Sequence, residues 1–444
     1  MLKVASRYVR AIKDYYVFYE WKLQKHPVLY GSLIALLIIV PLVVDWLAPR
    51  DWQSVAFLSP IVATALAIAG FFARSLTAYG PRKKEFRSNA KLLELTKNVK
   101  PSQLEQAAGF ETVSPRNGAV GSFTYSPSFN ANFVSDDAWD PTLIKHEKSS
   151  RYENIIRAIR TNAAEFRAHS FRIFLASLAP NRKTLINEHK VGLMTDILPG
   201  TETVEVYRTD YFSDICLVTN GVKDIYELRE HEAKLVDDAM DRRMPYAASR
   251  GEEIRLREFS TSSPPISLHI GVEVLALSKD FLFRVPLQGK GVQYSQGMRA
   301  PYASGSLDWE DCTSSSSLKE AVLTGAKREL EEEWGGKGKV PRVQSMEVMG
   351  FFRHGERGGK PQFVCIARLD DDDADIWPDT TENSRGDTPA RTSSIEALSK
   401  EVERLLSEQF NNPDSVALFG ALMCLKGILQ DRPDFISKVF FAQT

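Results

Sequence analysis

The chain has 444 residues, enough for a membrane anchor and one or two globular domains. Its 56 Lys and Arg residues nearly balance its 57 Asp and Glu residues, for a formal net charge of -1. This balance excludes a globally basic nucleic-acid-binding protein, so we expect no direct binding of DNA or RNA. Four cysteines without a CxxC pair exclude a local zinc site and predict buried thiols in a reducing compartment: Cys216, Cys312, Cys365 and Cys424.

The N-terminal region predicts two transmembrane α-helices, at residues 27–48 and 53–76. Each contains an apolar stretch of about 20 residues, the length that crosses a bilayer as a helix, and Asp45 is the only charge in these two stretches. Trp46 and Trp52 flank the short connection, as in an interfacial aromatic belt. A signal peptide is the alternative for the first stretch, but a second apolar stretch follows it at once.

The basic residues predict the orientation of these helices. They gather before the first span and after the second, whereas the connecting loop contains only Arg50. Positive charge favours the cytoplasmic side, so we expect a multi-pass protein of the bacterial inner membrane with both termini in the cytoplasm. Residues 1–26, rich in basic and aromatic side chains, are expected to form a cytoplasmic amphipathic helix at the membrane surface.

Two regions connect this anchor to the C-terminal part. Residues 77–149 are expected to form a juxtamembrane helix, near Arg82–Lys100, and a Ser-, Asn-, Gly- and Pro-rich linker over Ser114–Asp140. Residues 150–265 are expected to form an α+β region that either precedes the main sheet or elaborates it. Its expected elements are a helix at Ser150–Ala168, a strand at Thr203–Tyr207 and a charged helix near Ile225–Arg243.

Residues 266–444 have the pattern of a cytosolic α/β domain with C-terminal helices. Short β-rich runs alternate with longer helical patterns. An acidic loop is expected at Asp370–Asp375, with its run Asp370–Asp373 as a solvated turn. The expected elements are a hairpin of Ile270–Leu277 and Phe281–Val285, a helix at Leu318–Trp334, strands at Glu347–Arg353 and Gln362–Leu369, and helices at Ser394–Gln409 and Ser415–Leu429.

Three carboxylates in the predicted helix Leu318–Trp334 point to metal chemistry. Glu329, Glu332 and Glu333 stand at i, i+3 and i+4, so a helix places them on one face. A Mg²⁺ ion would offset their repulsion and could activate water beside a diphosphate. The alternative is a solvated acidic helix face, because glutamate is a good helix former.

The segment around these glutamates resembles the Nudix box. Glu320, seven intervening residues and the run from Arg328 to Gly335 fit the family pattern in register. The resemblance implies a Nudix-like α/β/α sandwich over about Ile266–Leu369, with Glu329, Glu332 and Glu333 as the catalytic and Mg²⁺-binding carboxylates. It also implies that Glu320, Arg328 and Gly335 hold the loop–helix–loop together.

The chain departs from the family pattern in the loops. Ser314 stands where the pattern has its first Gly, Gly336 stands where it has a closing aliphatic, and a Ser-rich loop precedes the box. These loops shape the site in the family, so the resemblance leaves catalysis undecided. Four residues are candidates for contacts with a nucleotide, the alternative for each being a surface or solvent-facing role: Arg284, Arg299, Arg353 and His354.

The overall layout resembles the two-transmembrane Nudix effectors of bacterial CBASS antiphage systems. That resemblance implies a homo-oligomer whose Nudix-like domain senses a cyclic oligonucleotide made by a partner synthase, and whose transmembrane helices then assemble to disrupt the inner membrane. The alternative is a membrane-anchored, Mg²⁺-dependent Nudix hydrolase of nucleoside diphosphate derivatives. A third reading is a membrane scaffold that binds no nucleotide.

Overall fold

The computed structural model describes part of the chain, which divides into two compact units. The described residues are 85–89, 99–114, 121–135, 139–147, 170, 188–214, 218, 224–229, 232–237, 246–247, 253–259, 268–289, 297–379, 383–386, 388–408 and 415–442. One unit comprises Met1–Arg87, Arg172–Asn187 and Tyr226–Lys234, and the other comprises the remaining residues. The predicted N-terminal helix, both predicted spans and the predicted helix Ser150–Ala168 lie outside the described residues. Within the described ranges, no helix combines the length and hydropathy needed to cross a membrane.

A three-stranded sheet lies in the part of the chain where the sequence predicts helices. Its strands follow the order β1 (Glu85–Asn89), β7 (Asp224–Arg229) and β8 (Glu232–Asp237). The helix predicted near Ile225–Arg243 is therefore wrong over β7 and β8, and the one predicted near Arg82–Lys100 is wrong over β1. The glutamate, leucine and lysine residues of these segments favour helix locally, but strand pairing overrides that weak preference.

The larger unit is built on a mixed eight-stranded sheet with the order β18-β12-β11-β16-β15-β3-β2, in which β14 also pairs with β11. Strands β11 and β16 are parallel, and every other pair in the sheet is antiparallel. The strands are β2 (Glu111–Val113), β3 (Phe123–Tyr125), β11 (Gly271–Leu277), β12 (Leu282–Phe283), β14 (Ala303–Ser306), β15 (Val343–His354), β16 (Lys360–Leu369) and β18 (Ala390–Arg391).

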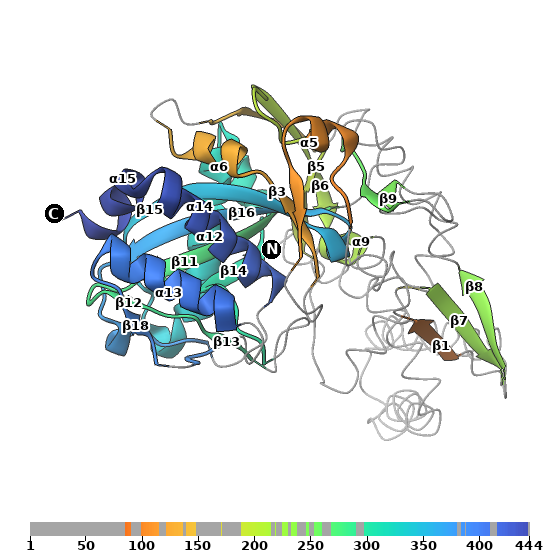
Figure 1. The fold of residues 1–444 in the computed structure, drawn as a ribbon. Helices are drawn as coiled ribbons and strands as arrows, with labels where there is room; N and C mark the ends of the chain where they lie inside the picture. The colour runs from red at the N-terminus through yellow and green to blue at the C-terminus, as the bar shows by residue number, and fades with distance from the viewer. Residues whose placement is uncertain are drawn as a thin grey trace, which may run out of the picture. The chain divides into compact units, whose positions relative to one another are not determined.

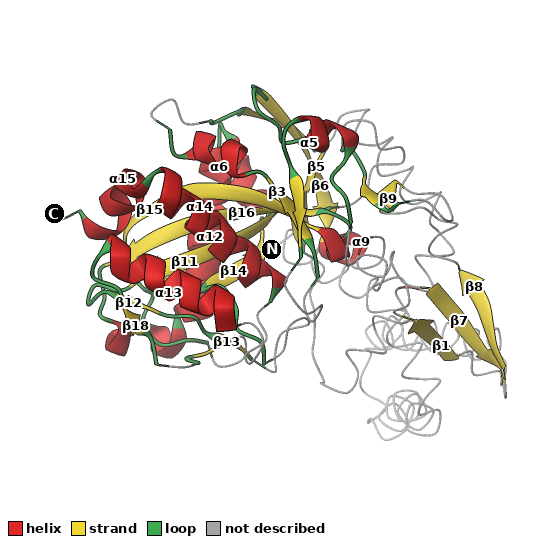
Figure 2. Ribbon diagram, in the orientation of Figure 1, coloured by secondary structure: helices red, strands yellow, loops and turns green. Residues whose placement is uncertain are grey.

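Helices pack on the two faces of this sheet. Figure 1 shows the blue helices α13 and α14 lying across the central strands, and Figure 2 shows the same layers by type of element. The described helices are α5 (Gln103–Ala107), α6 (Pro127–Phe133), α9 (Tyr211–Asp214), α11 (Trp309–Thr313), α12 (Leu318–Trp334), α13 (Ile395–Ser407), α14 (Val416–Asp431) and α15 (Pro433–Ile436). The result is a mixed α/β fold.

Strand register shows that α12 and α14 lie on opposite faces. Gly305 of β14 faces the Glu329 carboxylate of α12 and pairs with Val272, and that row continues through Phe363 to Phe351. Phe352, the next residue of β15, faces Gly420 of α14. Because successive side chains of a strand point to opposite faces, the sheet lies between the two helices.

The hairpin, helices and strands predicted for residues 266–444 are confirmed, with small shifts at their ends. β11 is buried along its whole length, as its apolar run predicts, and Leu277 pairs with Phe283 across the hairpin turn. The box helix has the predicted bounds, Leu318–Trp334. Three cysteines are confirmed as buried free thiols, namely Cys312, Cys365 and Cys424, whereas Cys216 lies outside the described residues.

The stretch Ser114–Asp140, predicted as loops or a linker, instead contributes to the core. It contains β3, which pairs with the end of β15, and α6, whose Asn130 Oδ1 accepts a hydrogen bond from the Phe351 amide at 2.9 Å. Phe123 packs edge-on against Phe352 with ring centroids 5.3 Å apart. Small and polar residues are frequent in this stretch, but its few aromatic residues provide the contacts that bury it.

A smaller sheet with the order β4-β6-β5 adjoins the ends of β11 and β14. Its strands are β4 (Thr142–His146), β5 (His189–Leu193) and β6 (Thr203–Asp210), the last confirming the predicted strand Thr203–Tyr207. Val191 donates to the carbonyl of Leu307 at 3.1 Å and accepts from the amide of Ile270 at 3.0 Å. Two antiparallel pairs complete the described strands, β9 (Tyr246–Ala247) with β10 (Arg255–Leu256) and β13 (Leu287–Gln288) with β17 (Asn383–Ser384).

Gly420 allows α14 to pack closely on the sheet, and this contact gives a first prediction. A Cβ at Gly420 would lie 2.6 Å from the Phe352 ring, so Gly420→Ala is expected to destabilise the fold by about 1–3 kcal/mol through overpacking. Gly427 of the same helix has no atom within 4 Å of such a Cβ, so Gly427→Ala is expected to be neutral or to stabilise by up to about 1 kcal/mol. Denaturant unfolding of the two variants checks the difference, and equal effects would contradict the packing.

Candidate functional site

The box helix α12 begins at a hydrogen-bonded cap. Ser317 Oγ accepts the Glu320 amide at 3.2 Å, and Glu320 Oε2 accepts the Ser316 amide at 2.7 Å. Hydrogen bonds from the amide and the hydroxyl of Ser316 hold the pKa of Glu320 below its ordinary value. Glu320 therefore fixes the first turn of the helix, as the box pattern implies. The buried face follows helical spacing: Leu318, Ala321, Val322, Gly325, Ala326, Glu329, Leu330, Glu333 and Trp334.

The loop departures from the box have local structural reasons. Ser314 caps the short helix α11 at a φ of -92°, so its position does not need glycine. Gly335 caps the end of α12, and a Cβ there would lie 2.5 Å from the carbonyl oxygen of Glu331. At Gly336 a Cβ would lie 2.5 Å from the carbonyl oxygen of Pro378, so an aliphatic side chain is excluded by the segment that packs there.

Two of the three box carboxylates are buried against β14. Glu329 lies over Gly305, where a Cβ would approach its carboxyl carbon to 2.0 Å. Burial raises the pKa of Glu329 to about 7, which nearby Arg328 opposes. Glu333 Oε1 accepts the Ser304 amide at 2.7 Å, and its Oε2 accepts from the Asn383 side-chain amide. Glu333 thus ties three separate segments together.

Glu332 and Arg328 form the outer part of the box. The Glu332 side chain is 57% exposed, and its Oε2 lies 3.2 Å from Arg328 Nη1. The same guanidinium donates to Glu329 at 2.9 Å, to Asp311 at 2.9 Å and to the Ser306 carbonyl at 3.0 Å. Arg328 therefore pairs with two of the three carboxylates that the sequence pattern offers to a metal, Glu329 and Glu332.

These residues do not fit a Mg²⁺ ion in the arrangement that the structure has. Within the described ranges, no three His, Cys, Asp or Glu side chains converge as a metal site. Glu329 and Glu332 share Arg328, and Glu333 is occupied by two amide donors. The three carboxylates have different surroundings, since Glu329 and Glu333 are buried whereas the Glu332 side chain is 57% exposed.

Arg284 and Arg299, predicted to contact nucleotide, are buried in structural contacts. Arg284 pairs with Asp373 on two oxygens, with Nε 2.7 Å from Oδ1. Arg299 Nη2 donates to the Leu405 carbonyl at 3.3 Å. Arg284 contacts the turn after β16, whereas Arg299 contacts α13, so the structure does not bring the two arginines to one site.

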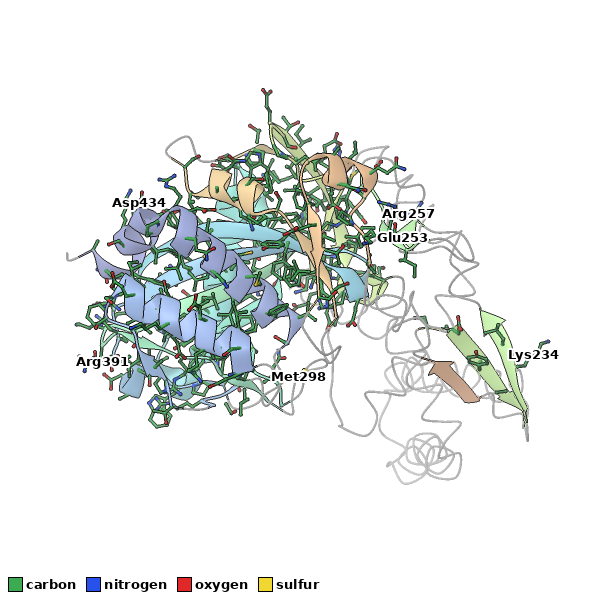
Figure 3. The ribbon with its side chains drawn as sticks, viewed as in Figure 1. Lys234, Glu253, Arg257, Met298, Arg391 and Asp434 are labelled. Atoms are coloured by element: carbon green, nitrogen blue, oxygen red, sulfur yellow. The ribbon has the colours of Figure 1, made fainter. Side chains whose placement is uncertain are left out.

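Arg353 and His354, the other predicted contacts, point to opposite faces of β15. Arg353 is fully buried, and its guanidinium donates to the Glu105 carboxylate at 2.9 Å. It also donates to the carbonyls of Gly359 and Arg257, at 2.9 and 3.0 Å, and Arg257 is labelled in Figure 3. His354 is buried on the other face, where burial first and Arg357 second lower its pKa.

The acidic run after β16 is not the solvated loop that its composition predicts. Asp371 and Asp373 are buried, whereas Asp370 and Asp372 alternate with them at the surface. Asp371 Oδ2 accepts the Arg342 amide at 2.8 Å, and Asp373 receives Arg284. Alternate carboxylates therefore anchor the turn to the sheet.

The structure also assembles a buried polar cluster that the sequence analysis missed. Glu273, Lys360, Gln362 and His354 share one face of the sheet, since Gln362 pairs with Gly271 and His354 with Lys360. Burial raises the pKa of Glu273 to about 8 and lowers that of Lys360 to about 7. Within the described part of the chain, Glu273 Oε2, Gln362 Oε1 and both His354 ring nitrogens have no hydrogen-bond partner. Glu273 interrupts an apolar strand, which is the signal that could have identified it.

His269, beside this cluster, gives a prediction about pH. Its Nε2 donates to the Asp210 carbonyl at 3.1 Å, and burial lowers its pKa from 6.5 to about 4, which Asp214 opposes. The folded state therefore favours the neutral ring, and this contribution is present above pH 6.5 and lost as the pH falls toward 4.

We expect wild type to lose about 2 kcal/mol more unfolding free energy than His269→Gln between pH 7 and pH 5. Glutamine retains an N–H donor but does not titrate, so it removes this pH dependence specifically. Denaturant titrations at the two pH values measure the difference. Parallel losses in the two proteins would contradict the assignment.

A pocket of about 550 Å³ opens at the C-terminal end of α12. The residues that line it come from the end of the box and from the segment after β16: Gly335, Gly336, Trp377, Pro378, Asp379, Ser384 and Arg385. Backbone bonds hold its wall, from the Gly336 amide to the Trp377 carbonyl at 3.0 Å and from the Asp379 amide to the Glu333 carbonyl at 2.7 Å. Its volume lies in the range of small-molecule sites.

The site and sheet define a mixed α/β domain that carries a box-like helix, and comparisons with known proteins add little to that description. No family model matches the chain, and no curated protein matches it. Among solved structures, DR0079 from Deinococcus radiodurans is 14% identical and covers 36% of this chain and 82% of its own length, with a TM-score of 0.24. Tm1382, described as a candidate Nudix hydrolase, is 14% identical over 37% of this chain and 73% of its own, also with a TM-score of 0.24. Likenesses at this level do not assign a family.

Proposed function

We propose that this chain is a membrane-anchored effector of a cyclic-oligonucleotide antiphage (CBASS) system. A Nudix-like domain senses the nucleotide, and the two predicted N-terminal spans carry the response to the bacterial inner membrane. The support for the Nudix-like assignment is the box sequence itself, which forms a capped helix between loops and packs on a mixed sheet. The support for the anchor is the pair of apolar stretches at residues 27–48 and 53–76.

The arrangement of the box carboxylates favours sensing over hydrolysis. Glu333 accepts hydrogen bonds from Ser304 and Asn383 on its two oxygens, and Arg328 pairs with both Glu329 and Glu332. A hydrolase of this kind needs carboxylates available to a metal, whereas a sensor needs only a stable cleft. This observation carries the proposal.

The response would follow from a shift in assembly. Ligand favours an oligomer only through a higher affinity for that state than for the unassembled one. Small residues in the second predicted span, including Ala63, Ala67 and Gly70, would let the helices pack closely when they cluster. A cyclic-nucleotide synthase would be the functional partner that supplies the ligand.

The second candidate is a membrane-anchored Nudix hydrolase of nucleoside diphosphate derivatives. The observation in its favour is the pKa of Glu329, which burial raises to about 7. A carboxyl group that titrates near neutral pH is suited to general acid–base catalysis.

The test measures binding and turnover in the same samples of full-length protein in detergent micelles. A panel of cyclic di- and trinucleotides and nucleoside diphosphate derivatives is incubated with the protein and Mg²⁺. We expect a cyclic oligonucleotide to bind without product. Product formation that is lost in Glu333→Gln but kept in the matched variant Glu331→Gln would overturn sensing and establish the hydrolase. If the protein binds none of these nucleotides, the remaining interpretation is a membrane scaffold.

A further inference from the structure

We infer that the pocket at the C-terminal end of α12 binds a nucleobase, stacked on Trp377, as the recognition site for the nucleotide ligand. This inference rests on the proposed function, because it names where that ligand docks. The pocket combines an aromatic surface, one carboxylate, one guanidinium and the two glycines Gly335 and Gly336. Such a mixture matches a flat heterocycle with a polar edge better than an aliphatic chain.

Trp377 supplies the stacking surface. It is 38% exposed, among the few large apolar residues of the described chain that reach solvent. Arg385 lies over one face of its ring at 4.5 Å from the centroid, so a cation–π contact holds the indole and a base would stack on the opposite face. An oriented aromatic ring at a pocket wall accepts any base through its π-face.

Two other lining residues, Asp379 and Arg385, can recognise the polar edge of the base and the negative charge of the ligand. The Asp379 carboxylate accepts hydrogen bonds only, so it suits N–H groups at a base edge. The Arg385 guanidinium donates to the carbonyls of Asp373 and Ala374 at 2.9 and 3.1 Å, which fixes its positive charge close to the pocket. A phosphate attached to the base would gain from that charge.

The pocket also has a direct connection to the box. Asp379 donates its amide to the Glu333 carbonyl, and Asn383 bonds the Glu333 carboxylate. The segment that carries Trp377 therefore also donates hydrogen bonds that Glu333, the third box glutamate, accepts. Glycine at position 336 is what allows this segment to approach, because a Cβ would collide with the carbonyls of Trp377 and Pro378.

The experiment measures equilibrium binding of AMP, GMP and ribose 5-phosphate to the full-length chain in detergent micelles. We expect AMP or GMP to bind wild type, and ribose 5-phosphate, which lacks a base, to bind far more weakly. Trp377→Leu should raise the nucleotide Kd about 10- to 100-fold, and Trp377→Phe by no more than about 5-fold. Ser384→Phe, which fills the pocket from its rim, should cause a loss similar to that of Trp377→Leu.

Val340→Ala is the matched control. Val340 is an exposed apolar residue just beyond the same helix, is absent from the pocket lining and should leave the Kd unchanged. Equal nucleotide binding by wild type, Trp377→Leu and Ser384→Phe would overturn the pocket assignment and leave the proposed sensing function intact. No base-dependent binding by wild type would also overturn the pocket assignment, and it would overturn the sensing function too only if no cyclic oligonucleotide of the panel binds.

Discussion

Replacing Arg353 with methionine is expected to lower the free energy of unfolding by about 3–5 kcal/mol. The guanidinium is fully buried, stacks on Phe259 at 4.2 Å from the ring centroid, and donates to Glu105 at 2.9 Å. Its loss would leave the buried Glu105 carboxylate without its cation and would remove the hydrogen bonds to the carbonyls of Gly359 and Arg257. Denaturant unfolding of the full-length protein measures the change.

Arg391 supplies the control for this experiment. It is exposed on β18, as Figure 3 shows, so Arg391→Met should change the stability by no more than about 0.5 kcal/mol. Combining Arg353→Met with Glu105→Gln should cost less than the sum of the two single changes, because the pair is coupled. A loss under about 1 kcal/mol in Arg353→Met would show that α5 is not anchored to the sheet.

Replacing Arg328 with methionine is expected to destabilise the fold by about 2–4 kcal/mol. The expected effect is smaller than for Arg353 because the Arg328 side chain is 22% exposed. Without it, the buried carboxylates of Asp311 and Glu329 lose their shared cation, and the Ser306 carbonyl loses a donor. The box arginine is thus expected to act first as a structural residue.

Lys327 is the matched position for Arg328. It neighbours Arg328 on α12, its side chain is 63% exposed, and its ion pair with Glu331 is 3.9 Å long. Lys327→Met should change the unfolding free energy by less than about 0.5 kcal/mol. If the two variants were equally stable, the network around Arg328 would not hold the box in place.

Local sequence patterns predict the central fold well. The box helix follows from its helical pattern and its match to the box, and β11 and β16 follow from β-rich runs. Each of these signals lies within the element that it predicts. The α/β class of residues 266–444 could therefore be inferred without knowledge of any contact.

The errors arise where distant segments decide the structure. Glu227 and Lys234 lie in strands that pair with each other, although their neighbours favour helix. The aromatic residues that bury β3 and α6 are spread through a stretch rich in serine, asparagine and glycine. Strand pairing and core contacts between segments far apart in the chain cannot be read from local composition.

The candidate site shows the same limit. Spacing identifies Glu329, Glu332 and Glu333 as candidates. It does not predict that Asn383, fifty residues later, donates a hydrogen bond to the Glu333 carboxylate. Spacing also cannot place Trp377 at the end of the box helix, because that contact depends on a turn anchored by buried aspartates. Sequence spacing therefore identifies candidate functional residues but does not predict which distant residues contact them.

The most direct test of the central claim is ligand-triggered permeabilisation of vesicles. Full-length protein is reconstituted into dye-loaded vesicles of inner-membrane lipid composition, and the cyclic oligonucleotides of the binding panel are added in turn. We predict retention of dye without ligand and release on addition of one cyclic oligonucleotide, with the linear form inactive. Dye release that is independent of ligand, or retention with a cyclic oligonucleotide bound, would contradict a nucleotide-gated membrane effector.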